Sequence, residues 1–566
     1  MPYAKYVADW YFARARAMLW SQSRHVNGAR KMTDSELDNL TIADAAKRIL
    51  TRELSPVELT QKLLRRIERL DAQIHAFNTL VPERALTAAQ IAEKEIARGQ
   101  YRGPLHGIPV GIKDVYSTAG ILTSGYSRAY LNNVPAQDAT AVAKLTAKGA
   151  ILMGKLATHE LANGAPSFDL PWPPARNPWN TAHFTGGSST GPGAAVAAGF
   201  VLGALGTDTG GSIRIPAALC GVVGLKPTYG LVSRTGVIPH SYSFDHCGPL
   251  AWTVEDCAIL LQAIAGHDPL DPASSDAPCE DYHVALNGDI RGLRIGVIRH
   301  YWEEELVAPP EVCRAMDEAI AVFLKLGARV EDVRLPSLQR HYDVKTIITK
   351  SEVFEAHHGK LVERIDDFGS DFLALTLPGC LFSGVDCARA QAERRRLSRA
   401  MSELFTQYDV LLTASSGPAP PLEATSARRV VDHWKKPNFE TVFNVTRGPA
   451  LALCNGYTTD GLPLSMQIAG RPFGEVAVLR AGHAYEQATA WRNRRPNLIP
   501  GATVMDVTAA TAPVFNADHD PVTQEYVRVM TGRAGLKLTA ERFAQLCMLG
   551  PFALAAASRV AEPGSL

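Results

Sequence analysis

The segment Ala204–Pro216 constrains the fold more than any other part of the chain. A short apolar run at residues 201–205 is followed by a polar, glycine-rich turn that ends at Ser212. Gly210 and Gly211 can adopt backbone angles that other residues avoid, so successive N–H groups of the turn can point to one spot. A serine hydroxyl beside converging amides supplies the nucleophile and the oxyanion site that acyl transfer requires. Taken alone, such a segment is more often a tight turn that happens to carry a serine.

Two further segments change this interpretation. Residues 185–198 read Thr-Gly-Gly-Ser-Ser-Thr-Gly-Pro-Gly-Ala-Ala-Val-Ala-Ala, a glycine-serine loop followed by small residues that predict a helix. Residues 107–114 place Lys113 at the end of an apolar, strand-like run. Most lysines in such a position lie at a strand edge and extend the ammonium group into water. A lysine that is buried there has a lowered pKa, because desolvation disfavours the charged form.

Together these segments resemble the amidase signature family of serine hydrolases. That family has a Ser-Ser-Lys triad: a lysine after an Ile-Lys-Asp strand, a serine in a Gly-Gly-Ser-Ser loop and a nucleophile in Gly-Gly-Ser-Ile-Arg. These positions fall on Lys113, Ser188 and Ser212. The resemblance runs from about residue 40 to about residue 495, with further motifs at residues 176–179, 220–228, 245–249 and 461–467. It implies an amide hydrolase with Ser212 as nucleophile and a cis-type peptide bond at Ser188.

The residues themselves also define a chemistry. A free serine hydroxyl is a poor nucleophile and needs a base within hydrogen-bond reach. None of the three segments contains a histidine, so Lys113 is the candidate base. Lowering the lysine pKa from about 10.4 to neutrality requires about 4 kcal/mol, which burial can supply. Ser188 would then relay a proton between Lys113 and Ser212.

The turn around Ser212 supplies further groups. The expected oxyanion donors are the backbone N–H groups of Thr209, Gly210, Gly211 and Ser212. Asp208 and Arg214 flank the turn and are expected to support it, Arg214 by pairing with a carboxylate. Ser189 is expected to hydrogen-bond within its loop rather than to carry a proton.

The glycine-serine loop departs from the family pattern and also matches a competing motif. Thr190 replaces a glycine and Pro192 follows, so we expect Thr190 to place a side chain near the substrate mouth. Residues 187–191 satisfy Gly-x-Ser-x-Gly, the nucleophile elbow of α/β-hydrolases, which requires a buried strand before it. Residues 176–185 are instead a polar, proline-containing segment. The elbow interpretation is therefore not favoured.

Composition bounds the class of protein. The chain has 566 residues, of which 46% are hydrophobic, enough to form a large core. Its formal net charge is +1, so no overall electrostatic field would attract nucleic acid or an anionic membrane. Nine scattered cysteines without a Cys-x-x-Cys pair indicate reduced thiols and a cytoplasmic location. The histidines, including His357 and His358, lack metal-ligand spacing, so neither a metal nor a cofactor is expected. The expected partner is a small-molecule amide or carbamate substrate of a homodimer, with no nucleic acid and no membrane.

The chain divides into four parts. We expect a basic and aromatic helical extension at residues 1–31, the catalytic domain at residues 32–500, a linker at residues 501–518 and a small helical appendix at residues 519–566. The appendix suggests two or three helices, at residues 522–530, 540–549 and 552–560.

Within the catalytic domain, local signals predict individual elements. Capping boxes at Thr41 and Ser55 begin two helices, and Leu63, Leu64, Ile67 and Leu70 form the buried stripe of the second. Residues 268–440 are the variable, substrate-side region. Inside it, about 340–385 is predicted to be irregular and aromatic.

The alternation of short apolar runs with helices, together with the resemblance, predicts an α/β/α sandwich around a mixed, largely parallel central sheet. The predicted function is hydrolysis of an amide carbon–nitrogen bond through a Ser212 acyl-enzyme, with esters, anilides or carbamates as further substrates. One alternative is the amidase (A) subunit of a tRNA-dependent amidotransferase, which frees ammonia from glutamine inside a complex. Residues 154–160, the loop at 186–191 and both terminal extensions depart from that subunit. The other is a catalytically silent binding protein, which would have lost a triad residue.

Overall fold

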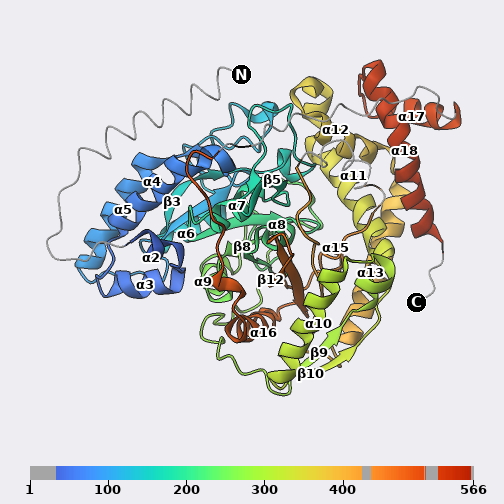
Figure 1. The fold of residues 1–566 in the computed structure, drawn as a ribbon. Helices are drawn as coiled ribbons and strands as arrows, with labels where there is room; N and C mark the ends of the chain where they lie inside the picture. Colours follow the sequence, from blue (N-terminus) through green and yellow to red (C-terminus); the bar gives the residue numbers. More distant parts are fainter. Residues whose placement is uncertain (1–32, 423–433, 435, 503, 505–520, 563–566) are drawn as a thin grey trace.

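The computed structural model describes residues 33–422, 434, 436–502, 504 and 521–562 (Figure 1). The predicted extension at residues 1–31 and nearly all of the predicted linker at residues 501–518 lie outside these described residues. Strands form an 11-stranded central sheet and a separate two-stranded sheet. The strands are β1 (Phe77–Leu80), β2 (Pro109–Lys113), β3 (Ile151–Leu156), β4 (Arg176–Asn177), β5 (Asn180–Phe184), β6 (Gly203–Asp208), β7 (Val223–Lys226), β8 (His246–Ala251), β9 (Arg294–Val297), β10 (Arg329–Asp332), β11 (Val410–Ala414), β12 (Ala450–Tyr457) and β13 (Pro463–Gly470).

The central sheet is mixed, with the strand order β1-β3-β2-β6-β8-β7-β12-β13-β11-β9-β10. Neighbouring strands are parallel toward the two flanks, where β2 pairs with β3 and β6 and where β9 pairs with β10 and β11. The pairs that lead from β6 across the centre to β11 are antiparallel, as is the outer pair of β1 and β3. The parallel pair of β2 and β6 is the one that positions the candidate site.

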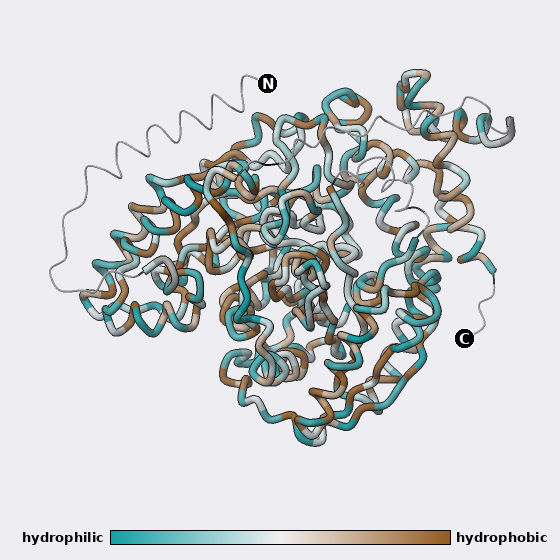
Figure 2. The backbone as a smooth tube through the Cα atoms, in the orientation of Figure 1, coloured by the Kyte–Doolittle hydropathy of each residue, from teal (hydrophilic) through white to brown (hydrophobic). Residues whose placement is uncertain are grey.

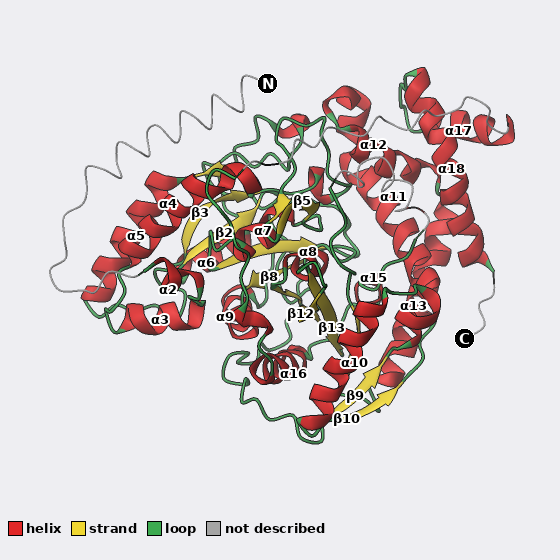
Figure 3. Ribbon diagram, viewed as in Figure 1, coloured by secondary structure: helices red, strands yellow, loops and turns green. Residues whose placement is uncertain are grey.

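Helices cover both faces of this sheet (Figure 3). They are α2 (Asp34–Asp38), α3 (Ile42–Leu50), α4 (Pro56–Ile74), α5 (Pro82–Ala97), α6 (Thr140–Ala147), α7 (Thr190–Ala197), α8 (Arg214–Cys220), α9 (Val254–Ile264), α10 (Pro310–Lys325), α11 (Leu338–Arg364), α12 (Ser370–Thr376), α13 (Gly384–Leu404), α15 (Thr441–Val445), α16 (Glu475–Ala488), α17 (Pro521–Arg533) and α18 (Ala540–Ala561). Gly203 and Gly206 of β6 face opposite sides of the sheet. A β-carbon on Gly203 would meet Leu260 of α9 at 2.6 Å, and one on Gly206 would meet Ser189, which precedes α7, at 2.8 Å. The predicted α/β/α sandwich is therefore confirmed.

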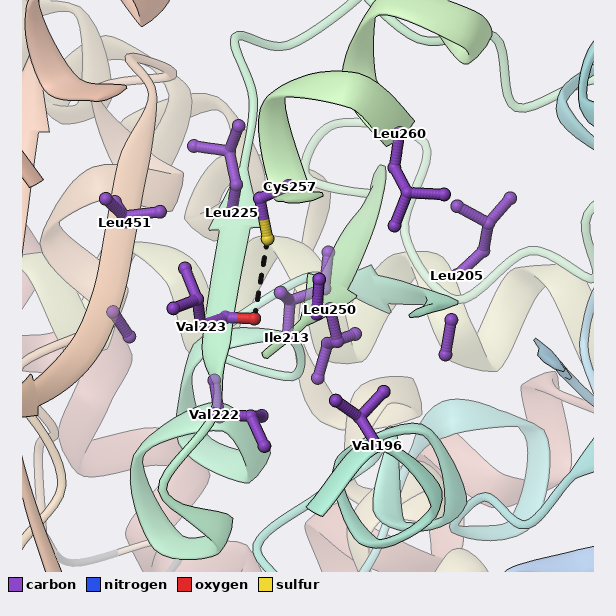
Figure 4. Close-up of a cluster of buried hydrophobic side chains, with 14 of the residues drawn as sticks. Val196, Leu205, Ile213, Val222, Val223, Leu225, Leu250, Cys257, Leu260 and Leu451 are labelled. Atoms are coloured by element: carbon purple, nitrogen blue, oxygen red, sulfur yellow. Dashed lines mark hydrogen bonds between the residues drawn. The ribbon is translucent and has the colours of Figure 1, made fainter. Parts of the chain in front are cut away.

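The main core lies between the strands and these helices. Leu205, Val223 and Leu250 come from neighbouring strands and are 1%, 4% and 0% exposed (Figure 4). The Cys257 thiol of α9 donates a hydrogen bond to the Val223 carbonyl at 3.6 Å, so this thiol packs as part of the core. Hydrophobic and hydrophilic residues alternate along the outer helices, as burial of one helix face requires (Figure 2).

The first helices of the catalytic domain begin where the sequence predicts. Thr41 accepts a hydrogen bond from the Asp44 amide at 3.0 Å, and Ser55 accepts one from the Glu58 amide at 3.1 Å. These are the N-caps of α3 and α4. The predicted apolar stripe of α4 is buried, which confirms the helical periodicity: Leu63, Leu64, Ile67 and Leu70 are its members.

Residues 340–385 are largely helical, so the prediction of an irregular stretch is wrong. They belong mainly to α11 and α12. Every side chain from His341 to Lys350 is buried, and this part of α11 is therefore enclosed on all sides. A helix without an exposed face has no amphipathic period, which is why its sequence shows none.

The two C-terminal helices pack on this region, with α18 against α11 and α13 (Figure 1). Residues predicted as separate helices at 540–549 and 552–560 form the single helix α18, which contains Pro551. Arg559 of α18 makes two hydrogen bonds of 2.6 Å to the Asp343 carboxylate of α11. Among the described residues, α18 is also long and apolar enough to cross a membrane, and 44% of its most apolar 18-residue stretch is buried inside the protein. The helices Ser370–Leu381 and Gly384–Leu404, which meet at a sharp bend, are together also long and apolar enough to count as one such span.

Candidate active site

The parallel pairing of β2 and β6 brings two predicted site segments to one edge of the sheet. Ile112 of β2 pairs with Leu205 of β6. Because the strands run in the same direction, their C-terminal ends lie together. β2 ends at Lys113, and β6 ends at Asp208, where the turn to Ser212 begins. The carboxyl ends of parallel strands are a frequent position for ligand sites.

Lys113 is completely buried and contacts two hydroxyl groups. Its Nζ lies 2.7 Å from Ser188 Oγ and 2.8 Å from Thr207 Oγ1. Burial lowers the pKa of Lys113 to about 7, although Asp208 and Asp245 act to raise it. A large fraction of this lysine is therefore uncharged near neutral pH and able to accept a proton. Its exposure of 0% excludes the alternative of an edge lysine that reaches water.

The glycine-serine loop lies directly against the turn that carries Ser212. Ser188 is 3% exposed, and the Gly187–Ser188 peptide bond is cis, as the resemblance implies. The Ser189 amide donates to the Ser212 carbonyl at 3.2 Å, which joins the two segments. The Ser189 hydroxyl donates to the Thr207 carbonyl at 3.2 Å and accepts from the Thr207 amide at 3.3 Å. The three segments of the predicted triad thus meet at one place.

The turn after β6 is built around the Asp208 carboxylate. Its oxygens accept hydrogen bonds from the Gly211 amide at 2.8 Å and from the Ile213 amide at 3.1 Å. Gly211 has a φ of +116°, and a β-carbon there would lie 2.7 Å from Ile215 and 2.8 Å from Glu440. Only glycine satisfies both the angle and the space at this position.

One predicted oxyanion donor is occupied by this arrangement. The Gly211 amide already donates to Asp208, so the structure does not leave it available to an oxyanion. The sequence places Asp208 beside the turn, but only the fold shows that its carboxylate points back at the amides before α8. The amides of Thr209, Gly210 and Ser212 have no acceptor within the described part of the chain and remain the candidate donors.

A buried arginine neutralises Asp208. Arg214 Nε and Nη2 donate to the two carboxylate oxygens, each at 3.0 Å, as a bidentate pair. Burial acts to raise the pKa of Asp208, but the Arg214 guanidinium, the Asn444 hydrogen bond and the charge of Lys226 together outweigh it and hold the pKa well below its usual range. Further N–H groups of Arg214 donate to the Glu440 carbonyl, Asn444 and Gln467. The turn is therefore fastened to α15 and β13.

Replacing Arg214 with methionine should strongly destabilise the protein, because it leaves a buried carboxylate without its cation. We expect the free energy of unfolding to fall by about 3–5 kcal/mol in urea denaturation. Arg399→Met is the matched control, since Arg399 pairs with Glu403 on the surface with 84% of its side chain exposed. The control should be indistinguishable from wild type. A loss below about 1 kcal/mol in Arg214→Met would show that the pair does not hold the turn.

Sequence reasoning missed three residues of this site. Thr207 contacts Lys113 from inside β6, where strand alternation from Leu205 places it on the same face. Asn444 and Gln467 reach Asp208 and Arg214 from segments far away in the chain. No local pattern marks them, because their role depends on how α15 and β13 pack.

Two expectations about the glycine-serine loop are changed by the structure. Thr190 is 4% exposed in the first turn of α7, all of whose residues are buried, so it does not reach an open substrate mouth. Residues 176–184 contain the strands β4 and β5 rather than only a loop. These strands form a separate two-stranded sheet, and Ser189 is completely buried, so the context of a nucleophile elbow is still missing.

Within the described residues, no group of three His, Cys, Asp or Glu side chains could hold a metal ion.

Comparison with known proteins places the chain among amidases. The family model described as Amidase matches residues 58–479. The A subunit of a glutamyl-tRNA(Gln) amidotransferase from Geobacter metallireducens is 39% identical over 494 residues, 82% of this chain and 100% of the relative. Two solved structures, each 31% identical, are also similar. The peptide amidase from Stenotrophomonas maltophilia has a TM-score of 0.71 over 81% of this chain and 98% of its own. The A subunit of the glutamyl-tRNA(Gln) amidotransferase from Thermotoga maritima has a TM-score of 0.68 over 81% of this chain and 96% of its own.

These relatives overturn the predicted partners. The expectation of a homodimer that acts on a small-molecule amide or carbamate, without nucleic acid, is contradicted by similarity to proteins named as one subunit of a glutamyl-tRNA(Gln) amidotransferase. Of these expectations, the exclusion of nucleic acid relied on the near-zero net charge. That charge describes the whole chain and does not exclude a partner that contacts one part of its surface.

The same comparisons settle the family. The matched model spans most of the chain, and similar proteins of known structure share its fold. The resemblance seen in the triad motifs is therefore confirmed. This chain belongs to the amidase signature family of enzymes that act on carbon–nitrogen bonds.

Proposed function

We propose that the chain hydrolyses a carboxamide through an acyl-enzyme at Ser212, as the A subunit of a tRNA-dependent amidotransferase that frees ammonia from glutamine. The observation that carries the catalytic part is the contact of 2.7 Å between Lys113 Nζ and Ser188 Oγ, in a loop bonded to Ser212 through the Ser189 amide. The alternative functions differ in what they require of these residues. A silent binding protein would have no reason to keep a buried lysine of lowered pKa against a serine.

In the proposed acylation step, neutral Lys113 accepts the proton of Ser188, and Ser188 accepts the proton of Ser212. The Ser212 oxygen then attacks the amide carbon, and the carbonyl oxygen becomes an anion bound by free amides of the turn. Collapse of this species breaks the carbon–nitrogen bond. The proton returns through Ser188 to the leaving nitrogen, which departs as ammonia. Water attacks the ester by the same proton path, which releases the acid and restores Ser212.

The amidotransferase part of the proposal rests on the relatives. Proteins named as the A subunit of glutamyl-tRNA(Gln) amidotransferase are 38–41% identical to this chain and align over nearly their whole length. In that role the amide is the side chain of glutamine, and the ammonia passes to a tRNA-bound glutamyl group with the help of other subunits. All nine cysteines are free thiols, which supports the proposed cytoplasmic location.

Ammonia release from L-glutamine tests the role. We expect the purified chain to hydrolyse glutamine slowly, and faster when companion amidotransferase subunits and glutamyl-tRNA(Gln) are added. The Ser212→Ala variant, measured in parallel, gives the background rate of ammonia release to be subtracted. Turnover of simple amides together with no turnover of glutamine under either condition would contradict the amidotransferase role and leave amide hydrolysis standing.

A further inference from the structure

Two lysines of α11 lie buried beside the turn that carries Ser212. Lys345 is 5% exposed and Lys350 is 1% exposed. A β-carbon built on Gly210 would lie 2.7 Å from Lys345 Cε and 3.1 Å from its Nζ. The Lys345 ammonium group is therefore next to a candidate oxyanion donor. Neither lysine takes part in the proton transfers proposed above.

Neither ammonium group has a carboxylate partner among the residues that the structure describes. Lys350 donates to Asn163 Oδ1 at 3.0 Å and lies 5.8 Å from the centre of the Trp434 ring. Lys345 lies 5.0 Å from the centre of the Tyr342 ring and has no hydrogen-bond acceptor in the described part of the chain. An ammonium group that is buried without an acceptor is costly unless a ligand supplies one.

The cost of burying a charged ammonium group is reflected in the lowered pKa of both lysines. Burial lowers the pKa of Lys345 to about 8, with Asp208 acting in the opposite direction. Burial, and then the charge of Lys345, lower the pKa of Lys350 well below its usual range. Lys345 is thus still mainly protonated at neutral pH, and an added anion would favour that form.

A neutral histidine lies within electrostatic reach of both lysines. His240 has its pKa lowered well below its usual range by burial and then by Lys350 and Lys345, and its Nδ1 is buried without a hydrogen-bond partner. Two described carboxylates beside the turn already have partners. Asp208 pairs with Arg214, and Asp245 accepts from Thr209 Oγ1 at 2.6 Å.

A third carboxylate on this side of the turn, Glu440, is bonded through one oxygen only: its Oε2 is buried without a hydrogen-bond partner among the described residues. Asp208, not Glu440, is the carboxylate that acts on the pKa of Lys345. Glu440 Oε1 accepts hydrogen bonds from the Ser415 hydroxyl at 2.9 Å and from the Ser416 amide at 2.8 Å. Among the described residues, Lys345 thus lies buried beside the turn without a hydrogen-bonded counter-anion.

We infer that Lys345, with Lys350 behind it, binds a carboxylate on the acyl part of the amide substrate. This inference rests on the proposed hydrolysis at Ser212, and it defines the substrate as a monoamide of a short dicarboxylic acid or a derivative such as glutamine. The proximity of Lys345 to Gly210 requires that only a few atoms separate the carboxylate from the reacting carbonyl. The acyl-enzyme then keeps its carboxylate on Lys345 while the nitrogen leaves.

Matched pairs of substrates test the inference. Succinamate and butyramide differ in a carboxylate or a methyl group at the far end, and so do glutaramate and valeramide. The wild type should show a higher kcat/KM for the anionic member of at least one pair, by about 10- to 100-fold, which is the range for a charge-assisted hydrogen bond. In Lys345→Met this ratio should fall toward one. Lys325→Met, a change of an exposed lysine at the end of α10, should keep the wild-type ratio.

Failure of the inference and failure of the proposed function give different results. Equal use of charged and neutral amides by both wild type and Lys345→Met would overturn the carboxylate site and leave hydrolysis at Ser212 intact. Absence of turnover and of serine labelling would remove the proposed hydrolysis. In that case binding of succinate still decides the inference: it should raise the melting temperature of the wild type more than that of Lys345→Met, and equal shifts would overturn it. Lys345→Gln serves as the second variant if Lys345→Met does not fold.

Discussion

Replacing Ser212 with alanine is expected to abolish both turnover and covalent labelling by a fluorophosphonate probe. The substitution removes the hydroxyl that would carry the acyl group and keeps the backbone amide of residue 212. Loss of a nucleophile on which a hydrolase depends lowers kcat by roughly 10³- to 10⁶-fold. Intact-protein mass spectrometry measures the labelled fraction, and ammonia release measures turnover.

Ser402→Ala is a suitable control for this experiment. Ser402 lies exposed on α13, where its hydroxyl donates to the Ser398 carbonyl at 2.9 Å, so its loss should leave labelling complete. Peptide mapping of the wild-type adduct should place the label on Ser212. An adduct that persists at Ser188 or Ser189 after Ser212→Ala would mean that the nucleophile has been assigned to the wrong serine.

Replacing Lys113 with methionine should lower kcat by about 10²- to 10⁴-fold, the usual contribution of a general base. It should also change the dependence on pH. The proposed base is the neutral amine, and the pKa of Lys113 is lowered to about 7 by burial. Below pH 7 the wild-type rate should fall about tenfold per pH unit as the amine gains a proton, and above pH 7 it should level off. The residual rate of Lys113→Met should lack this acidic limb.

Two comparisons make the assignment specific. Methionine is apolar and of similar length, so it suits a position that is 0% exposed, and circular dichroism should show an unchanged fold. Lys113→Arg keeps hydrogen-bond donors but cannot release a proton in a protein, so it should be inactive at every pH. A wild-type activity optimum well below pH 7 would be incompatible with a neutral lysine as base.

Much of the fold and of the site could be predicted because it depends on local chemistry. The N-caps at Thr41 and Ser55, the stripe of α4 and the strand that ends at Lys113 each follow from residue spacing. The glycines of the nucleophile turn follow from the backbone angle that Gly211 adopts. These signals extend over a few residues and need no knowledge of the rest of the chain.

The failed expectations share a different origin. The sequence does not predict α11, because burial from every side removes the alternation by which a helix is identified. Nor does it reveal that the Gly211 amide is occupied, because only the fold shows that the Asp208 carboxylate is turned toward it. The predicted absence of a nucleic-acid partner is wrong, because it relied on the net charge, which describes the whole chain and not its separate surfaces.

Three buried lysines show most clearly what the sequence determines and what only the tertiary structure decides. Lys113, Lys155 and Lys226 all lie on strands and are all 0% exposed. By itself, the sequence determined that Lys113 ends an apolar strand, that two serines lie in glycine-rich loops, and that these motifs belong to one enzyme family. Only the tertiary structure decided that Lys113 reaches a serine, whereas Lys155 pairs with Asp114 at 3.2 Å and Lys226 donates to backbone carbonyls. The reason is physical: the pKa of a buried ammonium group, and the proton it can accept, depend on every group packed around it, and those groups come from distant parts of the chain.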